Sequence, residues 1–146
     1  MSDANAIELE SSHELSRFLF RGEYGTRRVE SRDVRYVKPV AFIPPPASPG
    51  AVSVFFISGL DEKEVWEIGA EHVAPTRNKS IKGCAVFLVA DVFHAGLSLD
   101  PNNTPPRHVD IVGWPSEGSL VLLSAKLLAD AASVKLLDDP DSNTAV

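Results

Sequence analysis

The residues best suited to chemistry lie in one short stretch, Pro105 to Pro115, which reads Pro-Pro-Arg-His-Val-Asp-Ile-Val-Gly-Trp-Pro. If this stretch is a strand, His108 and Asp110 project to the same face about 7 Å apart, and Arg107 points to the other face. Because imidazole titrates near neutral pH, His108 could act as a general acid or base beside a carboxylate. The alternative is that both polar residues simply occupy the exposed face of a strand whose apolar neighbours face the core.

Two more residues are candidates for the same cleft. His94 ends an apolar run and could face His108, and Arg21 leaves the first expected strand ahead of a glycine-rich turn. Arg21 and Arg107 are therefore candidate ligand-binding residues for an anion, and His94, like His108, is a candidate catalytic group. The alternatives are a hydrogen-bonded, half-buried histidine and an ion pair between Arg21 and an acid such as Glu23.

Signals for a metal or a cofactor are missing from the sequence. A metal site built from His72, Cys84, His94 and His108 is not supported, because no Cys-x-x-Cys or His-x-x-x-His spacing occurs. No Gly-x-x-x-x-Gly-Lys phosphate loop, Gly-x-Gly-x-x-Gly fingerprint or Gly-x-Ser-x-Gly elbow is present either. We therefore expect neither a metal nor a cofactor.

Length and composition indicate one small globular domain. The chain has 146 residues, of which 44% are hydrophobic and 23% charged, and these are ordinary globular values. No apolar run approaches the roughly 20 residues that span a bilayer, and the first residues are acidic and polar rather than signal-like. A lone cysteine, Cys84, cannot form an intrachain disulfide. We expect a cytoplasmic protein without a membrane segment.

The formal net charge of −6 hides an uneven distribution. Residues 17–38 carry seven basic and three acidic side chains, whereas both ends of the chain are acidic. An acidic protein with one basic segment is not a general nucleic-acid binder, because nonspecific affinity depends on how many phosphates are neutralised. Contact with nucleic acid through residues 27–38 therefore stays open but is disfavoured.

Hydrophobic periodicity predicts several strands. Residues 15–21 alternate with a mixed second face, and residues 34–40 can form another strand, although Pro39 interrupts it. Residues 51–57 are apolar on both faces, which is typical of a central strand. Residues 84–97 suit either one long strand or a strand followed by a short helix, and the helical spacing of the later apolar residues favours the second.

Two helices are expected. The first runs from Asp61 to about Val73, where Pro75 prevents further extension. The second follows a Ser116 cap and runs from Glu117 to about Leu137. Its inward row is expected to contain Leu120, Leu123, Leu127, Leu128, Ala131 and Val134.

Together these elements predict a single α+β domain over residues 15–137, between flexible acidic ends at residues 1–14 and 138–146. We expect a mixed or mainly antiparallel sheet of about four to five strands, packed on a long C-terminal helix and a shorter middle helix. The run Pro44 to Gly50 is expected to be a rigid, polyproline-like loop.

Three stretches resemble a group of small bacterial proteins that have no assigned activity. They are Val-Ser-Val-Phe-Phe-Ile-Ser-Gly-Leu at residues 52–60, Glu-Val-Trp-Glu-Ile-Gly at residues 64–69 and Arg-His-Val-Asp-Ile-Val-Gly-Trp-Pro at residues 107–115. The resemblance covers roughly residues 37–136. It implies a bacterial, cytoplasmic protein and brings no catalytic residue with it.

Three functions remain open on the sequence. The leading hypothesis is a non-enzymatic binding or accessory module that contacts a protein partner, because no convergent catalytic motif is present. The first alternative is a small enzyme acting on a nucleotide or phosphorylated substrate through a cleft of Arg21, His94, His108 and Asp110. The second is nucleic-acid contact through the basic segment, where Tyr36 is the only well-placed aromatic for base stacking.

Overall fold

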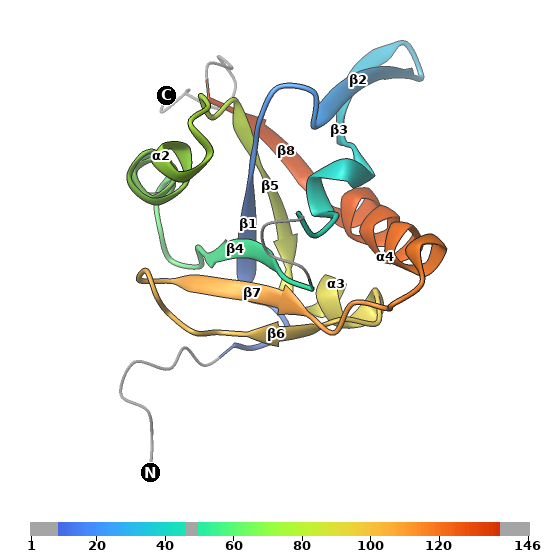
Figure 1. Ribbon diagram of the computed structural model, residues 1–146. Helices are drawn as coiled ribbons and strands as arrows, with labels where there is room; N and C mark the ends of the chain where they lie inside the picture. The colour runs from blue at the N-terminus through green and yellow to red at the C-terminus, as the bar shows by residue number, and fades with distance from the viewer. Residues whose placement is uncertain (1–8, 46–49, 138–146) are drawn as a thin grey trace.

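Six antiparallel strands form the central sheet, in the order β6-β7-β4-β1-β5-β8 (Figure 1). The computed structural model describes residues 9–45 and 50–137. The strands are β1 (Glu14–Leu19), β4 (Val52–Phe56), β5 (Gly83–Leu88), β6 (Ser98–Asp100), β7 (His108–Val112) and β8 (Ser133–Leu136). The expected α+β class is confirmed, and the main sheet holds six strands where about four to five were expected.

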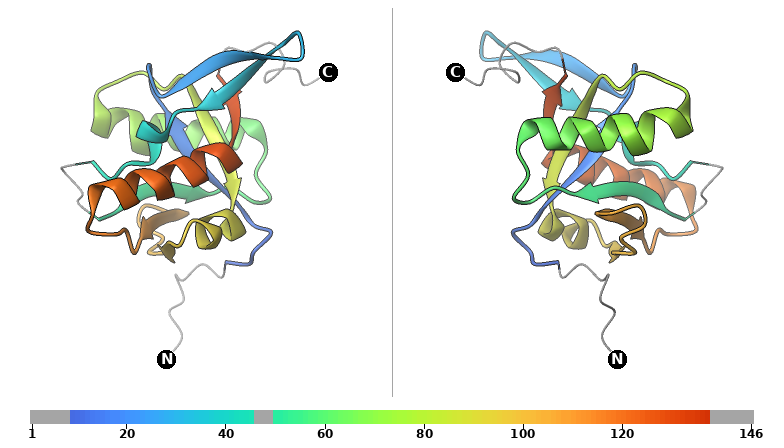
Figure 2. Two further views of the ribbon diagram at one scale, coloured as in Figure 1. Left: turned by 90° about the vertical axis from the view of Figure 1, so that its right-hand side faces the viewer. Right: turned by 90° about the vertical axis from the view of Figure 1, so that its left-hand side faces the viewer.

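Both faces of this sheet are covered, as the apolar central strand β4 requires (Figure 2). On one face lie α3 (Val89–His94), α4 (Gly118–Ala131) and the 3-10 turn η1 (Pro39–Phe42). On the other lies the helical run α1 (Glu62–Ile68), η2 (Gly69–Val73) and α2 (Ala74–Arg77). Because side chains alternate along a strand, Val52 and Val54 pack under α4, while Phe55 and Ile57 pack under α1.

The middle helix starts as expected and continues further than expected. The Asp61 carboxylate accepts a hydrogen bond from the amide of Glu64, whose side chain accepts one from the amide of Asp61 in return, which forms a capping box. Pro75 was expected to end the helix, but the helical course continues past it. A π-helical segment precedes it, and Pro75 falls in the first turn of α2, where a missing amide hydrogen costs little.

Gly69 allows this helical run to lie close against the sheet. A Cβ atom at this position would come within 2.7 Å of Phe18 Cε1 on β1 and of Ile81 Cδ1. With any larger residue here, either the Phe18 and Ile81 side chains or the helical run itself would have to shift.

The structure resolves the ambiguity over residues 84–97 in favour of a strand followed by a short helix. β5 ends at Leu88, α3 begins at Val89, and Gly96 adopts a left-handed φ of +80° just beyond the helix. The amide of Gly96 donates to the carbonyl of Phe93 there.

The C-terminal helix is shorter than predicted, since it was expected to run from Glu117 to about Leu137. α4 covers only Gly118–Ala131, and the chain then turns into β8, in which Val134 lies opposite Ala85 of β5. Pairing with β5, which would otherwise be an open edge, outweighs the helical pattern of the sequence. Ser116 is not the cap, because Glu117 holds that position and makes no side-chain capping bond.

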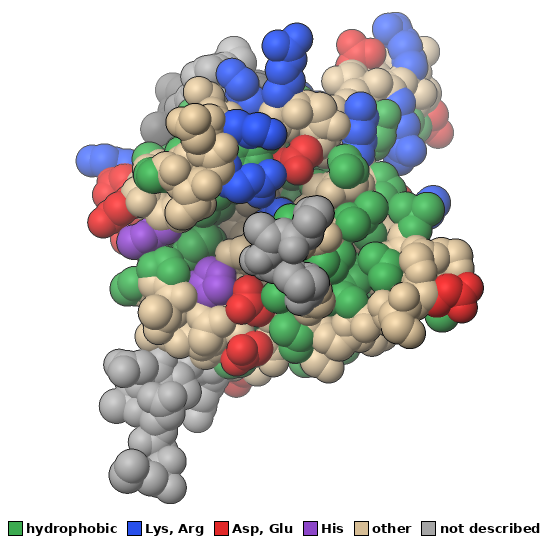
Figure 3. Space-filling view, in the orientation of Figure 1, with side chains coloured by type: hydrophobic (Ala, Val, Ile, Leu, Met, Phe, Trp, Pro, Cys, Tyr) green, Lys and Arg blue, Asp and Glu red, His purple; other side chains and the backbone are tan. Residues whose placement is uncertain are grey.

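The prediction of which α4 residues face the core was also wrong in part. Leu120, Leu123 and Leu127 are 46%, 53% and 47% exposed, and Figure 3 shows hydrophobic side chains gathered over this helix. The buried members of the helix are Ser124, Ala125, Leu128 and Ala129. Small residues let the helix approach the sheet and η1 closely, and the Ser124 hydroxyl donates to the carbonyl of Ala95 at 3.0 Å.

The basic segment forms a two-stranded hairpin, β2 (Tyr24–Val29) and β3 (Arg32–Val37), separate from the main sheet. The strand expected at residues 34–40 thus lies earlier, at 32–37, because Pro39 begins the turn η1. Lys and Arg side chains gather at the end of the molecule from which the hairpin projects (Figure 3).

Residues 1–8, 46–49 and 138–146 lie outside the described residues, so the expected flexible acidic ends and the expected polyproline-like loop are described only in part or not at all. The part of the first end that is described is held to the sheet, since the amide of Val89 donates to the carbonyl of His13 and the His13 ring lies 5.0 Å from that of Phe56. Within the described residues, none of the helices has both the length and the apolar character needed to cross a bilayer.

The burial of Leu128 and the exposure of Leu123 on α4 predict unequal losses of stability when each is replaced by alanine. Replacing the fully buried Leu128 by alanine should lower the free energy of unfolding by about 2–5 kcal/mol, because it leaves a cavity. Leu123→Ala, on the exposed row, should change it by less than about 0.5 kcal/mol. Urea unfolding followed by circular dichroism measures both, and equal losses would contradict the packing of α4 described here.

Candidate active site

Four polar side chains meet on the face of the sheet that carries α1, beyond the end of that helix. They are Ser53 on β4, His108 and Asp110 on β7, and Asn102 in the loop between β6 and β7. Ser53 lies opposite Asp110 in the strand register, and Phe55 lies opposite His108. His108 is therefore the diagonal neighbour of Ser53, close enough for their side chains to touch.

The side-chain amide of Asn102 has a single consistent orientation. Its Nδ2 donates to Asp110 Oδ2 at 3.0 Å, and its Oδ1 accepts from the backbone amide of Thr104 at 3.2 Å. A carboxylate only accepts and a backbone amide only donates, so both contacts assign the oxygen to the same side. That oxygen lies 2.6 Å from His108 Nδ1.

This orientation decides the tautomer of His108. Because Asn102 Oδ1 is an acceptor, neutral His108 carries its hydrogen on Nδ1 and leaves Nε2 with a free lone pair. Ser53 Oγ lies 2.6 Å from Nε2 and donates its hydroxyl hydrogen to it. The chain Ser53–His108–Asn102 thus has the polarity of a nucleophile, a base and a residue that orients the base.

Asp110 is placed to stabilise the protonated form of the histidine. Its Oδ1 lies 3.5 Å from His108 Nε2, on the same nitrogen that contacts Ser53. When Nε2 accepts a proton, this carboxylate becomes the partner of an imidazolium ion. Asp110 therefore favours proton transfer from Ser53 without itself contacting the hydroxyl.

Burial keeps His108 neutral near pH 7. Desolvation lowers the pKa of His108 below its usual value of 6.5, and the nearby carboxylates of Asp110 and Asp100 oppose this without reversing it. Aromatic side chains pack on one side of the imidazole. The Phe55 ring lies 5.4 Å from the imidazole in an edge-on arrangement, and His72 of η2 stacks against the same phenyl ring.

The loop between β6 and β7 folds back on β7 and so holds Asn102 in place. The amide of Asn102 donates to the carbonyl of Asp100, and the amide of Asn103 donates to the carbonyl of His108. Asn103 Oδ1 in turn accepts from the amide of Arg107 at 2.7 Å. Arg107 has a left-handed φ of 73°, so the backbone of this loop is sharply turned just before β7.

The Arg107 side chain contacts Phe56 on β4 and so has a structural role. Its Nη1 donates to the carbonyl of Phe56 at 3.2 Å, and its guanidinium lies 5.4 Å from the centre of the Phe56 ring. Phe56 packs against the core on the opposite face of β4 from Ser53. The structure therefore does not bring the Arg107 side chain into the cluster as a ligand-binding group.

His94 and Arg21, the other sequence candidates, also lie away from the cluster. His94 ends α3, whose Val89 and Val92 pack with the core on the far side of β7 from His108. Arg21 is exposed, and the residue that lies 4.0 Å from Glu23 is Arg77 instead. The expected shared cleft of Arg21, His94, His108 and Asp110 does not form.

A buried arginine positions the strand that carries Ser53. Arg17 Nη1 donates to the carbonyl of Ser53 at 2.8 Å, and its Nε donates to the carbonyl of Ala41 in η1 at 2.9 Å. Only 8% of Arg17 is exposed, and this burial lowers the pKa of its guanidinium to about 10. Arg17 remains charged at neutral pH and fixes the backbone at Ser53.

Sequence reasoning missed Ser53 and Asn102. Ser53 is the one polar residue in the apolar run of residues 51–57, which is a usable signal for a side chain at the rim of a covered face. Asn102 sits in a loop rich in Asn, Pro and Asp, and nothing in its spacing distinguishes it from its neighbours.

Within residues 9–45 and 50–137, no group of three or more His, Cys, Asp or Glu side chains is arranged to hold a metal ion. Comparison with protein-family models, with curated proteins and with solved structures gives no match for this chain. The geometry of the cluster is therefore the basis for assigning a function.

In the folded protein the pKa of His108 should lie below 6.5, and NMR of its imidazole protons across a pH series measures it. Asp110→Asn should lower it further, because the carboxylate raises this pKa. Between the folded pKa and 6.5 the unfolded chain binds the proton more readily, so the contribution of His108 to stability decreases as the pH falls below 6.5. A folded pKa above 6.5 would show that Asp110 outweighs burial.

Arg17→Met should lower the free energy of unfolding by about 2–4 kcal/mol, because two buried carbonyl groups lose their donor. Arg21→Met, which removes an exposed arginine from the same segment, should change it by less than about 0.5 kcal/mol. Chemical denaturation of the two variants makes the comparison, and a mild effect at Arg17 would mean that water replaces the guanidinium.

Proposed function

We propose that the protein is a small hydrolase or acyl transferase in which Ser53 is the nucleophile and His108 the general base. The observation that carries this proposal is the pair of 2.6 Å contacts on the two nitrogens of one imidazole, Ser53 Oγ at Nε2 and Asn102 Oδ1 at Nδ1. A serine hydroxyl is a weak nucleophile alone and becomes effective when an oriented base removes its proton.

The chemistry follows from these positions. As Ser53 Oγ forms a bond to the acyl carbon of a substrate, its proton passes to His108 Nε2, and Asp110 stabilises the imidazolium. The imidazolium then returns the proton to the departing alcohol, thiol or amine, which leaves an ester on Ser53. A water molecule or second acceptor, deprotonated by the same nitrogen, releases the acyl group and restores the serine hydroxyl.

Local charge favours a neutral or cationic substrate over a phosphorylated one. The carboxylates near His108 are those of Asp110 and Asp100, and neither Arg21 nor Arg107 points a free guanidinium at the cluster. A phosphate group would meet repulsion there without a compensating cation. We therefore favour esters, thioesters or amides as the substrate class, in place of the nucleotide considered from the sequence.

A fluorophosphonate probe should modify Ser53, as located by mass spectrometry of tryptic peptides. Ser53→Ala should abolish the adduct, and His108→Gln should slow its formation about 10²–10⁴-fold, because the general base is lost. The rate in the parent protein should fall only when the pH drops through the lowered pKa of His108, which lies below 6.5, because the imidazole becomes protonated there.

Ser119→Ala is the matched control, because Ser119 is exposed on α4 and hydrogen bonds to Glu117 rather than to a histidine. Its labelling should equal that of the parent protein. Labelling of the parent at several serines with similar rates, or unchanged labelling of His108→Gln, would show that Ser53 is not activated.

A further inference from the structure

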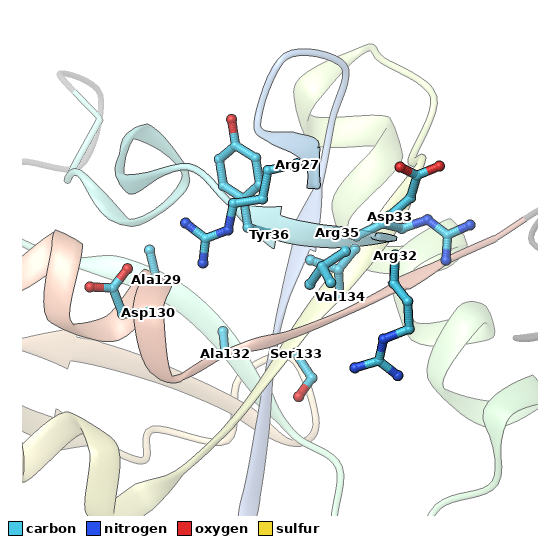
Figure 4. Close-up of a pocket in the computed structure, with 11 residues that line it drawn as sticks. Arg27, Arg32, Asp33, Arg35, Tyr36, Ala129, Asp130, Ala132, Ser133 and Val134 are labelled. Atoms are coloured by element: carbon cyan, nitrogen blue, oxygen red, sulfur yellow. The ribbon is translucent and has the colours of Figure 1, made fainter. Parts of the chain in front are cut away.

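A groove of about 540 Å³ separates the hairpin from the end of the main sheet and is distinct from the Ser53 cluster (Figure 4). Its hairpin wall contains Arg27, Arg32, Val34 and Tyr36, and its other wall contains the end of α4 and the start of β8, including Asp130 and Val134. We call it the arginine groove.

The pairing of the hairpin places two arginines on the side that faces the groove. Arg27 lies opposite Val34, and Val29 lies opposite Arg32. Since side chains alternate along each strand, Arg27 and Arg32 share one face with Val34 and Tyr36. Figure 4 shows both arginine side chains extending from the hairpin toward α4 and β8.

These two arginines lack a carboxylate partner among the described residues, whereas the two aspartates of the groove each lie beside a basic side chain. Asp130 binds Lys126 at 2.8 Å, and Asp33 lies 3.6 Å from Arg28. Neither Arg27 nor Arg32 forms an ion pair with any carboxylate of the described residues. The arginine groove therefore has an uncompensated positive charge above apolar side chains from both walls.

Each wall also includes a strand with one unpaired edge. In the described part of the chain, β3 pairs with β2 alone and β8 pairs with β5 alone. β3 nevertheless packs beside β8, and the groove lies between them. Unpaired backbone amides and carbonyls at such edges are the groups that an added strand uses.

We propose that the arginine groove binds an extended acidic segment of a protein partner, which adds as a strand to the open edge of β8 or β3. Acidic side chains of the segment would pair with Arg27 and Arg32, and its alternate apolar side chains would contact Val34 and Val134. This gives the protein partner expected from the sequence a place on the molecule, and it does not depend on catalysis at Ser53.

Nucleic acid fits this groove less well. Nonspecific affinity for nucleic acid depends on how many phosphates are neutralised, and only a few arginines reach the groove. Tyr36, the aromatic side chain that could stack on a base, already carries the Arg27 guanidinium 5.2 Å from its ring centre. The unpaired strand edges, in contrast, offer backbone donors and acceptors that match those of an extended peptide.

Fluorescence anisotropy with a short labelled peptide of alternating glutamate and valine tests the proposal. The full chain should bind this peptide, and added salt should weaken the complex. The charge reversals Arg27→Glu and Arg32→Glu together should weaken binding at least about tenfold, because two charge-assisted contacts become repulsive. N-methylation of alternate peptide amides should weaken binding to a similar extent, since it removes backbone donors.

Arg21→Glu together with Lys63→Glu is the matched control, because both residues are exposed, lie outside the groove and change the net charge by the same amount. This control should bind like the parent. If the reversed hairpin does not fold by circular dichroism, the milder pair Arg27→Gln and Arg32→Gln replaces it, with the same direction of effect.

Three results would overturn the proposal. They are no binding of the acidic peptide, binding that is insensitive to Arg27 and Arg32, and tighter arginine-dependent binding of a single-stranded oligonucleotide than of the peptide. The last result would assign the arginine groove to nucleic acid instead.

Discussion

The guanidinium of Arg17 adds a polar link between three parts of the molecule that share one hydrophobic core, namely β1, β4 and the turn η1. It leaves the middle of β1 and binds the carbonyls of Ala41 and Ser53, one in a 3-10 turn and one in the neighbouring strand. β1 and β4 form regular pairs only at Leu15–Phe56 and Ser16–Phe55. Beyond those pairs the arginine supplies the donor that a strand amide would supply in a regular ladder.

The use of a buried arginine in place of a strand amide has an energetic reason. Burying a cation costs several kcal/mol unless its hydrogen bonds are made, and a carbonyl left without a donor is costly as well. Each group removes the penalty of the other, so the arrangement is stable only when all the partners are in place. The position of Ser53 is therefore set by a long-range contact from β1 as well as by its own strand.

The polar cluster around His108 shows how a chain of hydrogen bonds transmits orientation. The carboxylate of Asp110 and the amide of Thr104 decide how Asn102 points, and Asn102 decides which nitrogen of His108 carries the hydrogen. The aromatic ring of Phe55 shields the imidazole from water and keeps it unprotonated. The contact between the Ser53 hydroxyl and an unprotonated imidazole thus depends on groups that do not themselves touch the hydroxyl.

The fold was more accessible to sequence reasoning than the site. Apolar residues on both faces identified β4 as central, and the helical spacing of the later apolar residues in the run 84–97 correctly indicated a strand followed by a helix. The boundary at Ala132 was missed because the helical pattern continues through Val134, and only the open edge of β5 explains the change to a strand. His108 and Asp110 could be picked out because they are two apart on one strand. Asn102 could not, since its role depends on how a loop folds back over β7.

The α4 helix has an exposed row of leucines beside its buried face. Hydrophobic burial alone therefore does not fix the rotation of the helix about its own axis. Turned by part of a revolution, Leu120, Leu123 and Leu127 would face the sheet and bury more hydrocarbon than the small residues that now do so. The bond from Ser124 to the carbonyl of Ala95 exists in the observed rotation, and a hydroxyl buried without it would be costly. The buried Ser124 thus favours the observed orientation of the helix at the expense of hydrophobic burial, and four leucines of α4 lie exposed at the surface, namely Leu120, Leu122, Leu123 and Leu127.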